Sequence, residues 1–303
     1  MASIKICSAY LGAKEYMEPL KNEVGGILDI HGQLILSSAP AIEAFWALNI
    51  WQNPIALEID SINDGAKKLK AIQCNWCLYS YQLHRRAKLI QEKLPHVSAK
   101  PLTFPCSPPS SQLGSWTLLE QNQILVASQC SSPFPNGEAV FKEDKEGPPS
   151  RAYLKLYEAL TRMERFPQPG DFCIDAGGSP GGWAWAMQKL GARVLSVDRS
   201  PLDPKIMSLP NVVYRKGDAF ALQPSDFDQV DWLFSDVISY PEKLFDWVST
   251  WIDSGKCKNF ICTIKFQGNP DYGFVSKFLE VEGSKVAHLY HNKHELTWMH
   301  TAG

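Results

Sequence analysis

The sequence lacks both a strong excess of one charge and any long apolar run. Its 303 residues hold 30 Lys and Arg against 32 Asp and Glu, which gives a net charge of -2. This balance excludes a general basic field, so contact with nucleic acid would have to come from local basic clusters. No apolar stretch approaches the ~18–20 residues of a membrane span, and no leader with a charged start and an apolar centre is visible. We expect a cytoplasmic protein with no membrane partner.

Paired metal-ligand motifs are also scarce. Among the eight cysteines, Cys74 and Cys77 have Cys-x-x-Cys spacing, but no second Cys or His pair follows at the spacing of a zinc site. Cysteines are commonly buried apolar side chains. The sequence therefore predicts reduced thiols and no bound metal.

Local basic clusters do occur, at residues 67–70 and 84–88, with Trp76, Tyr79 and Tyr81 between them. Interleaved basic and aromatic residues can stack on RNA bases. The same pattern also fits solvated helix faces with aromatic residues in the core, and the sequence favours that interpretation without excluding the first.

The length and the change of pattern along the chain predict two domains. Residues 1–130 read as a small α+β domain. Residues 131–149 are rich in Pro and Gly and carry mixed charge, so we expect a linker there. From residue 150 to 303, strand-like and helix-like segments alternate, which is typical of a doubly wound, mostly parallel sheet with ligands at the carboxyl ends of the strands.

Individual elements follow from apolar periodicity. In the first domain we expect a strand, a helix and a hairpin over residues 4–10, 14–24 and 27–36, a buried helix over 41–51, a strand over 55–59, a helical stretch over 67–94, and strands over 115–119 and 123–128. In the second domain we expect helices over residues 151–163, 182–190, 241–253 and 273–280, with strands ending at Asp175 and over 193–198, 212–214, 232–236, 260–265, 285–290 and 296–300. The last two strands should form an antiparallel hairpin.

A glycine-rich loop follows the first strand of this second domain. A dinucleotide fingerprint needs a third glycine where Ser179 or Pro180 stands, so hydride transfer from a nicotinamide cofactor is disfavoured. A turn of this kind beside an acid suits a ligand with an amino acid end, such as S-adenosylmethionine. The predicted cofactor residues of this loop are Asp175, Gly177, Ser179, Pro180, Gly181, Gly182 and Trp183.

Acidic residues end the next strands. Asp198 lies about twenty residues after the loop, where a carboxylate accepts hydrogen bonds from the two hydroxyls of a ribose. Asp218 could accept from the exocyclic amine of adenine while Phe220 packs on the ring. Together these residues predict an adenosine site, although either acid alone could be an ordinary turn residue.

Seven motifs in order resemble the FtsJ/RrmJ-type 2′-O-ribose methyltransferases, most closely the RlmM type that modifies a cytidine of large-subunit ribosomal RNA. The resemblance covers about residues 133–301 and is carried by residues 149–156 (PSRAYLKL), 174–183 (IDAGGSPGGW), 196–198 (SVD), 217–220 (GDAF), 234–237 (FSDV), 263–266 (TIKF) and 289–297 (LYHNKHELT). It implies a Rossmann-like S-adenosylmethionine-dependent methyltransferase sheet. The Lys-Asp-Lys-Glu tetrad of that family falls on Lys155, Asp236, Lys265 and Glu295.

Strand order supports the same tetrad from the residues alone, because Asp236, Lys265 and Glu295 stand at strand ends that can meet at one rim. A ribose 2′-OH must lose its proton to attack a methyl group, and a neutral lysine is a suitable general base. We assign this role to Lys265. Asp236 would orient Lys265 and the cofactor methyl group, and Lys155 and Glu295 would position the ribose.

Two alternatives remain at this point. A messenger-RNA cap ribose methyltransferase would share the tetrad, and a non-catalytic scaffold that binds S-adenosylmethionine and RNA would share the fold. The Gly-rich start of the loop and His294 before the glutamate depart from the family pattern, which bears on cofactor affinity and substrate preference. We expect structured RNA, ribosomal RNA first, as the partner, and an amino-terminal domain that helps to position it.

Overall fold

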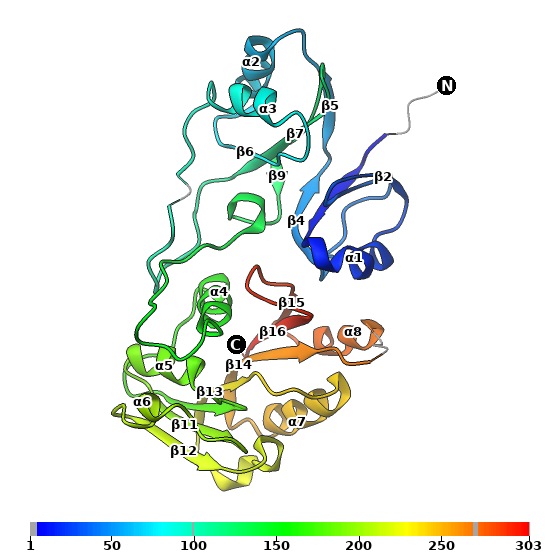
Figure 1. Ribbon diagram of the computed structural model, residues 1–303. Helices are drawn as coiled ribbons and strands as arrows, with labels where there is room; N and C mark the ends of the chain where they lie inside the picture. The colour runs from blue at the N-terminus through cyan, green and yellow to red at the C-terminus, as the bar shows by residue number, and fades with distance from the viewer. Residues whose placement is uncertain (1–4, 99, 269–271, 303) are drawn as a thin grey trace. The chain divides into compact units, whose positions relative to one another are not determined.

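In the computed structural model, residues 5–98, 100–268 and 272–302 are described. The chain divides into two compact units (Figure 1). The amino-terminal unit consists of Met1–Pro101 and Pro108–Val140, and the carboxyl-terminal unit consists of Leu102–Ser107 and Phe141–Gly303. The division after residue 140 falls inside the predicted linker 131–149. Residues 102–107, which were predicted to belong to the first domain, are instead part of the second unit.

Two sheets form the amino-terminal unit. One has the order β2-β3-β1-β4-β9 and the other the order β5-β8-β7-β6. The strands are β1 (Ser8–Gly12), β2 (Ile27–His31), β3 (Leu34–Ser37), β4 (Ala47–Gln52), β5 (Ile55–Glu58), β6 (Trp76–Leu78), β7 (Gly114–Glu120), β8 (Gln123–Ala127) and β9 (Gln129–Cys130), and the helices are η1 (Lys14–Tyr16), α1 (Met17–Glu23), α2 (Ile62–Ile72), α3 (His84–Gln91) and η2 (Pro135–Gly137). The predicted α+β class of this part is confirmed. Residue 4, at the start of the first predicted strand, lies outside the described residues.

Two predictions in this unit are wrong. The expected buried helix over residues 41–51 is absent: residues 41–46 are irregular, and from Ala47 the chain forms the strand β4, which pairs with β1 on one side and β9 on the other. Short apolar runs do not distinguish a buried helix from a buried strand, and the pairing partners decided here. The helical stretch over 67–94 is interrupted by β6, because Trp76 pairs with Gly114 of β7 and its ring is fully buried.

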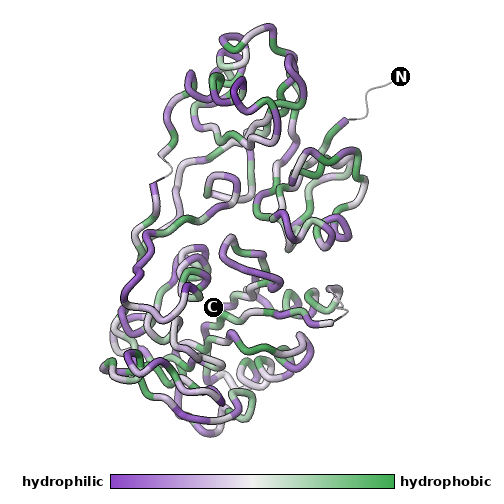
Figure 2. Tube along the Cα trace, in the orientation of Figure 1, coloured by the Kyte–Doolittle hydropathy of each residue, from purple (hydrophilic) through white to green (hydrophobic). Residues whose placement is uncertain are grey.

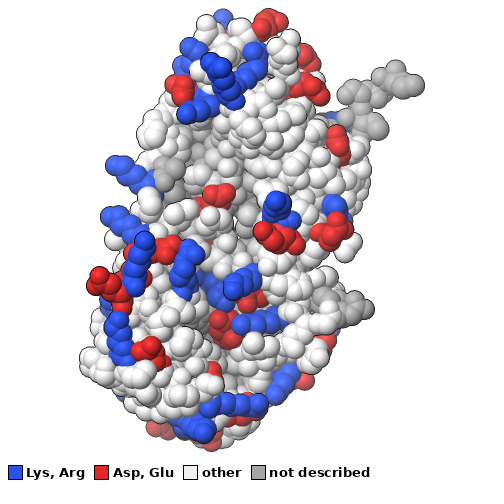
Figure 3. All heavy atoms as spheres, viewed as in Figure 1, with Lys and Arg blue, Asp and Glu red and all other residues white. Residues whose placement is uncertain are grey.

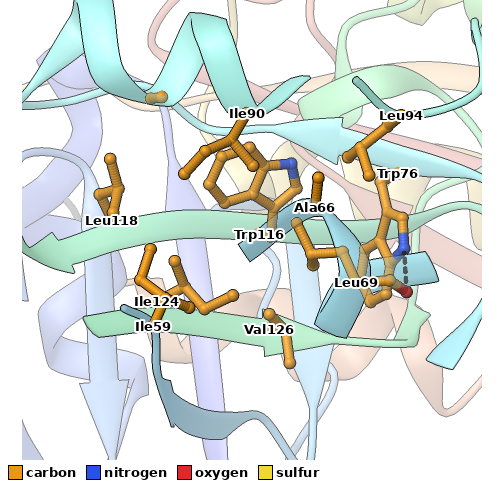
Figure 4. Close-up of a cluster of buried hydrophobic side chains, with 11 residues drawn as sticks. Ile59, Ala66, Leu69, Trp76, Ile90, Leu94, Trp116, Leu118, Ile124 and Val126 are labelled. Carbon is orange, nitrogen blue, oxygen red and sulfur yellow. Dashed lines mark hydrogen bonds between the residues drawn. The ribbon is translucent and has the colours of Figure 1, made fainter. Parts of the chain in front are cut away.

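The aromatic residues between the basic clusters belong mainly to the core. Trp76 packs with Leu69 and Ile90 and near Trp116 (Figure 4), and its indole nitrogen donates to the Leu69 carbonyl at 3.0 Å. Tyr79 is also buried. Basic side chains lie over α2 and α3 with acidic ones beside them (Figure 3). The interpretation as core rings beneath solvated helix faces is therefore confirmed for these two rings.

The carboxyl-terminal unit is a seven-stranded sheet of order β12-β11-β10-β13-β14-β16-β15. Its strands are β10 (Phe172–Ala176), β11 (Arg193–Asp198), β12 (Val212–Lys216), β13 (Val230–Ser235), β14 (Cys257–Lys265), β15 (Ser284–Ala287) and β16 (Glu295–Thr301), and its helices are α4 (Tyr153–Met163), α5 (Gly182–Lys189), α6 (Pro204–Met207), η3 (Ala219–Ala221), η4 (Pro224–Asp226), α7 (Pro241–Ser254), η5 (Tyr272–Phe274) and α8 (Val275–Leu279). The Rossmann-like α/β class is confirmed.

Pairing in this sheet places the candidate residues at one rim. The five strands from β12 to β14 are parallel, so their carboxyl ends meet at the same edge. The predicted hairpin of β15 and β16 is antiparallel, and β16 also runs antiparallel to β14. This direction brings the start of β16 to the carboxyl end of β14. The strand predicted over 285–290 ends earlier, at Ala287.

The hydropathy and burial of this unit's elements show where its core lies. Figure 2 shows a mostly hydrophobic β14 and a hydrophilic segment leading into α4. On α4, residues 153–161 are all buried, including Lys155 and Glu158.

Among the described residues, no helix combines the length and apolar character that crossing a bilayer requires.

Candidate active site

The four residues of the predicted tetrad form one connected cluster of alternating charge. Lys155 Nζ lies 3.0 and 2.9 Å from the two carboxylate oxygens of Asp236 and 2.8 Å from Glu295 Oε1. Lys265 Nζ lies 2.9 Å from Asp236 Oδ1 and 3.6 Å from Glu295 Oε2. Each lysine side chain thus faces both acidic side chains, and the cluster pairs two basic residues with two acidic ones.

Strand register explains how these residues meet. In the antiparallel pair of β14 and β16, Lys265 and Glu295 are direct partners, so their side chains stand on the same face of the sheet. Asp236 directly follows β13, whose residue Ser235 pairs with Cys262 of β14. Lys155 reaches the cluster from the first turn of α4.

Electrostatics within the cluster favour the charged forms of two of its members. Burial alone would lower the pKa of Lys155, but the carboxylates of Asp236 and Glu295 outweigh it, and the pKa is raised. Burial alone would raise the pKa of Asp236, but both lysines and a hydrogen bond from Thr263 outweigh it, and the pKa is lowered. The Thr263 hydroxyl donates to Asp236 Oδ1 at 2.7 Å. Lys155 is therefore held as an ammonium and Asp236 as a carboxylate.

A cavity of about 580 Å³ opens beside this cluster. Of the predicted cofactor residues, Gly177, Ser179, Asp198, Asp218, Phe220 and Asp236 line it. Lys265 lines it as well, whereas Lys155 and Glu295 do not. The cavity therefore joins the predicted adenosine site to one lysine of the tetrad.

Several predicted residues are not on the wall of this cavity. Asp175 is fully buried, Trp183 is almost so, and neither lines the cavity. The same holds for Pro180, Gly181 and Gly182. Asp175 lies in β10, and the other four residues lie in the loop and at the start of α5, so their predicted contact with a cofactor stays a prediction.

Asp175 supports the loop from below. Ser196 Oγ donates to its Oδ2 at 3.2 Å, and a Cβ added to Gly178 would collide with both side chains. Burial raises the pKa of Asp175 to about 7, with hydrogen bonds from Ser196 and the Ala184 backbone opposing the rise. The absence of a side chain at Gly178 lets the loop lie directly on this buried acid.

Trp183 has a comparable supporting place. Its indole nitrogen donates to the Ala152 carbonyl at 2.9 Å, and Lys155 Nζ lies 6.0 Å from the ring centroid. The ring therefore connects the start of α5 to the start of α4. In this place the ring helps to hold the helix that carries Lys155, and its predicted role as a cofactor residue stays a prediction.

The acids that do line the cavity already have protein partners. Asp198 accepts from the backbone amides of Ser179 at 3.1 Å and Ser200 at 2.8 Å. Asp218 accepts from Arg199 at 2.7 Å and from the Phe220 amide at 3.0 Å. The pKa of Asp218 is lowered, first by the Arg199 hydrogen bond.

The hydrogen-bond acceptors on the cavity wall fit a hydroxyl-bearing ligand such as S-adenosylmethionine. Three carboxylates, Asp198, Asp218 and Asp236, face it, and carboxylates accept hydrogen bonds from ribose hydroxyls and attract a sulfonium. The Phe220 ring lies on the same wall, with Lys243 Nζ 4.8 Å from its centroid. The size lies within the usual range for small-molecule sites.

Sequence reasoning missed part of this wall. The additional lining residues are Arg199, Gly217, Ala219, Val237, Ile238, Ser239, Tyr240, Lys243 and Gln267. Each lies close in sequence to a predicted residue at a strand end, and this proximity is the signal that could have found them. Thr263 lies two residues before Lys265 on β14, so strand alternation places both side chains on the same face of the sheet, where both contact Asp236.

No group of three or more metal-ligating side chains is present within residues 5–98, 100–268 and 272–302. Cys74 is exposed and Cys77 is partly buried, and all eight thiols are free. Burial raises the pKa of Cys77 to about 12. A thiol so held is a poor metal ligand, because the thiolate is the binding form.

Comparison with known proteins finds relatives that are similar to about half of this chain. The ribosomal RNA large subunit methyltransferase M of Halorhodospira halophila is 34% identical over 158 residues, which cover 49% of this chain and 46% of that protein. The protein of the same name from Xanthomonas oryzae pv. oryzae is 31% identical over 196 residues, covering 59% and 56%. The chain therefore spans about half the length of the curated relatives it matches.

Among solved structures, a ribosomal RNA methyltransferase from Plasmodium falciparum matches 50% of this chain and 96% of its own, with 15% identity and a TM-score of 0.38. Residues 148–292 match the FtsJ-like methyltransferase family. This match covers α4, the glycine loop, Asp236 and Lys265, and it ends three residues before Glu295. Residues 148–292 are thus similar to the FtsJ-like methyltransferases.

Proposed function

We propose that this protein transfers a methyl group from S-adenosylmethionine to a ribose 2′-OH of structured RNA, with ribosomal RNA as the first candidate. One observation carries the proposal. Asp236 and Lys265 belong to the tetrad cluster and also line the cavity, so the cluster can reach a ligand bound there. The names of the curated relatives support ribosomal RNA as the substrate class. The cytoplasm is the compartment that goes with this proposal.

The geometry distinguishes the two lysines. Lys155 forms short ion pairs with both carboxylates, its pKa is raised, and it does not line the cavity. Lys265 has one short and one longer ion pair and lines the cavity. Lys155 therefore serves as a fixed positive charge, and Lys265 is the group that can reach a substrate hydroxyl.

Proton removal is the step that these side chains supply. When bound, S-adenosylmethionine provides an electrophilic methyl group on a positively charged sulfur. Neutral Lys265 would accept the proton of the 2′-OH, and Asp236 would hold the Lys265 amine in place through the 2.9 Å contact. Asp198, Asp218 and Phe220 would hold the adenosine end of the cofactor.

The amino-terminal unit is proposed to position the RNA. Its basic residues on α2 and α3 are exposed or partly exposed, and acidic residues lie among them. A contact of this kind would be local and sensitive to salt. The buried aromatic residues beneath these helices, Trp76 and Trp116, stabilise the unit. They are not accessible for stacking on RNA bases.

Methyl transfer from labelled S-adenosylmethionine to ribosomal RNA tests the proposal. The product should resist alkaline cleavage at the modified ribose. The Lys265→Ala variant should lose roughly 100- to 10,000-fold in rate, the usual contribution of a general base. Lys258→Ala is the matched control, because Lys258 is exposed at the opposite end of the same strand.

Two outcomes would contradict the proposal. Full activity in Lys265→Ala would remove the general-base assignment. Tight cofactor binding without transfer to ribosomal RNA, transfer RNA or capped RNA, whether free or in particles, would favour a non-catalytic scaffold. Transfer only to capped RNA would favour a cap methyltransferase.

A further inference from the structure

Glu158 is a buried carboxylate outside the tetrad. It lies on α4 one helical turn after Lys155, so the two side chains share a face of the helix. Glu158 is completely inaccessible to solvent. Burying a carboxylate is unfavourable unless it is hydrogen-bonded, so its partners must be well placed.

Both oxygens of Glu158 accept hydrogen bonds from one connection of the sheet. The Tyr290 amide donates to Oε1 at 3.2 Å and the His291 amide donates to Oε2 at 3.4 Å. Arg162 donates to Oε1 from its Nε at 2.9 Å. The two amides belong to residues 288–294, which join β15 to β16 and directly precede Glu295.

This connection is bonded internally up to Glu295. His288 Nε2 contacts the Lys293 carbonyl at 3.0 Å, and Asn292 Nδ2 donates to the Glu295 carbonyl at 3.1 Å. The Lys293 amide lies 3.5 Å from Glu295 Oε1. A displacement of the connection would therefore move Glu295 with it.

Helix α4 consequently holds this part of the chain at two points. Lys155 contacts the Glu295 carboxylate at 2.8 Å, and Glu158 contacts the backbone four and five residues earlier. A buried ion pair such as Glu158 with Arg162 can often be replaced by apolar residues without loss of stability, so stability is a weak reason for its presence.

We propose that Glu158 is a positioning residue, which fixes the 288–294 connection against α4 and so sets Glu295 at its distance from Lys155. The proposal rests on the function proposed above for the tetrad. Glu158 does not line the cofactor cavity. Its loss should therefore affect the rate of the chemical step and leave cofactor binding unchanged.

Glu158→Gln tests this role with little change in shape. Glutamine has one acceptor oxygen and one NH2 group, so it can accept only one of the two backbone amides and directs a donor at the other. We expect kcat to fall by roughly 100-fold, as small misplacements of catalytic groups can cause. The dissociation constant for S-adenosylmethionine, measured by calorimetry, should change less than about twofold. Hydrogen exchange of a peptide covering 288–294 should become faster.

Two further variants separate positioning from simple stabilisation. Glu164→Gln changes an exposed acid at the end of the same helix and should behave as the unmodified protein. Arg162→Met removes the third partner of Glu158 but leaves both backbone amides bonded, so its kcat should fall much less than that of Glu158→Gln. All rates are measured well below the melting temperature of the least stable variant.

The outcomes are distinct. Unchanged hydrogen exchange over residues 288–294 in Glu158→Gln would overturn the proposal. If the unmodified protein is active, a kcat of Glu158→Gln equal to that of the unmodified protein would overturn it as well. Equal rate losses in Arg162→Met and Glu158→Gln would assign the effect to the ion pair and also overturn it. If the unmodified protein transfers no methyl group, the proposed function fails, and the exchange result alone decides whether Glu158 holds the connection.

Discussion

Asp175 should make the stability of the protein depend on pH, and the substitution Asp175→Asn should remove that dependence. The carboxyl group is fully buried beneath the glycine loop, and burial raises its pKa from 3.8 to about 7. Between these two values the folded chain keeps a proton that the unfolded chain has lost. Stability therefore falls as pH rises through this window, and the contribution is lost once the pH exceeds the folded value.

The size of the effect follows from the shift. One pKa unit corresponds to about 1.4 kcal/mol, and the folded carboxyl group is itself half titrated near pH 7, so between pH 5 and pH 7 the free energy of unfolding should fall by about 2 kcal/mol from this group alone. The asparagine variant carries no titrating group there, so its stability should be flatter over the same range. Below about pH 4 the group is protonated in both states, and its contribution is constant.

Urea unfolding at several pH values measures this difference. The useful quantity is the unfolding free energy of the unmodified protein minus that of Asp175→Asn, plotted against pH. Asp228→Asn is the control, because Asp228 is an exposed acid in the same unit. Parallel curves for the unmodified protein and Asp175→Asn would refute the reasoning, since they would mean that Asp175 binds no extra proton in the folded chain.

Two further predictions concern the cluster and the amino-terminal core. Asp236→Asn should lose at least roughly 100-fold in methyl transfer and about 3 kcal/mol in unfolding free energy, because the amines of Lys155 and Lys265 lose their shared carboxylate partner. Activity assays and urea unfolding check this, and retained activity would contradict it. Trp116→Ala should lower the free energy of unfolding by about 3–5 kcal/mol, because the ring is fully buried and its nitrogen donates to Gln91 at 2.8 Å. Thermal unfolding checks this, and an unchanged melting temperature would contradict it.

The fold of the second unit could be predicted well because its signals are local and repeated. Helix-like and strand-like periods alternate there, and alternation of this kind permits few topologies. In the first unit the signals conflict. Residues 41–51 are apolar enough for either a buried helix or a buried strand, and pairing of β4 with β1 and β9 decided the outcome. A short apolar run carries no information about such long-range pairing.

The same distinction applies to the site. Asp198, Asp218 and Asp236 lie on the cavity wall because a residue after a parallel strand reaches the carboxyl-end rim. Asp175 and Trp183 belong to the same motif but point into the protein, and motif spacing does not encode which side of a loop a side chain occupies. Glu158 was missed because it falls on the apolar face of α4, where helical periodicity assigns core packing.

The tetrad itself depends on strand register, so its geometry and the fold support each other. Lys265 and Glu295 are direct partners in the antiparallel pair of β14 and β16. A slip of one residue would place Leu296 beside Lys265 and turn Glu295 to the other face of the sheet. The apolar side chains of β16 resist such a slip because Leu296, Trp298 and Met299 are buried at their present positions. The packing that stabilises this sheet edge is therefore also what places the glutamate within reach of both lysines.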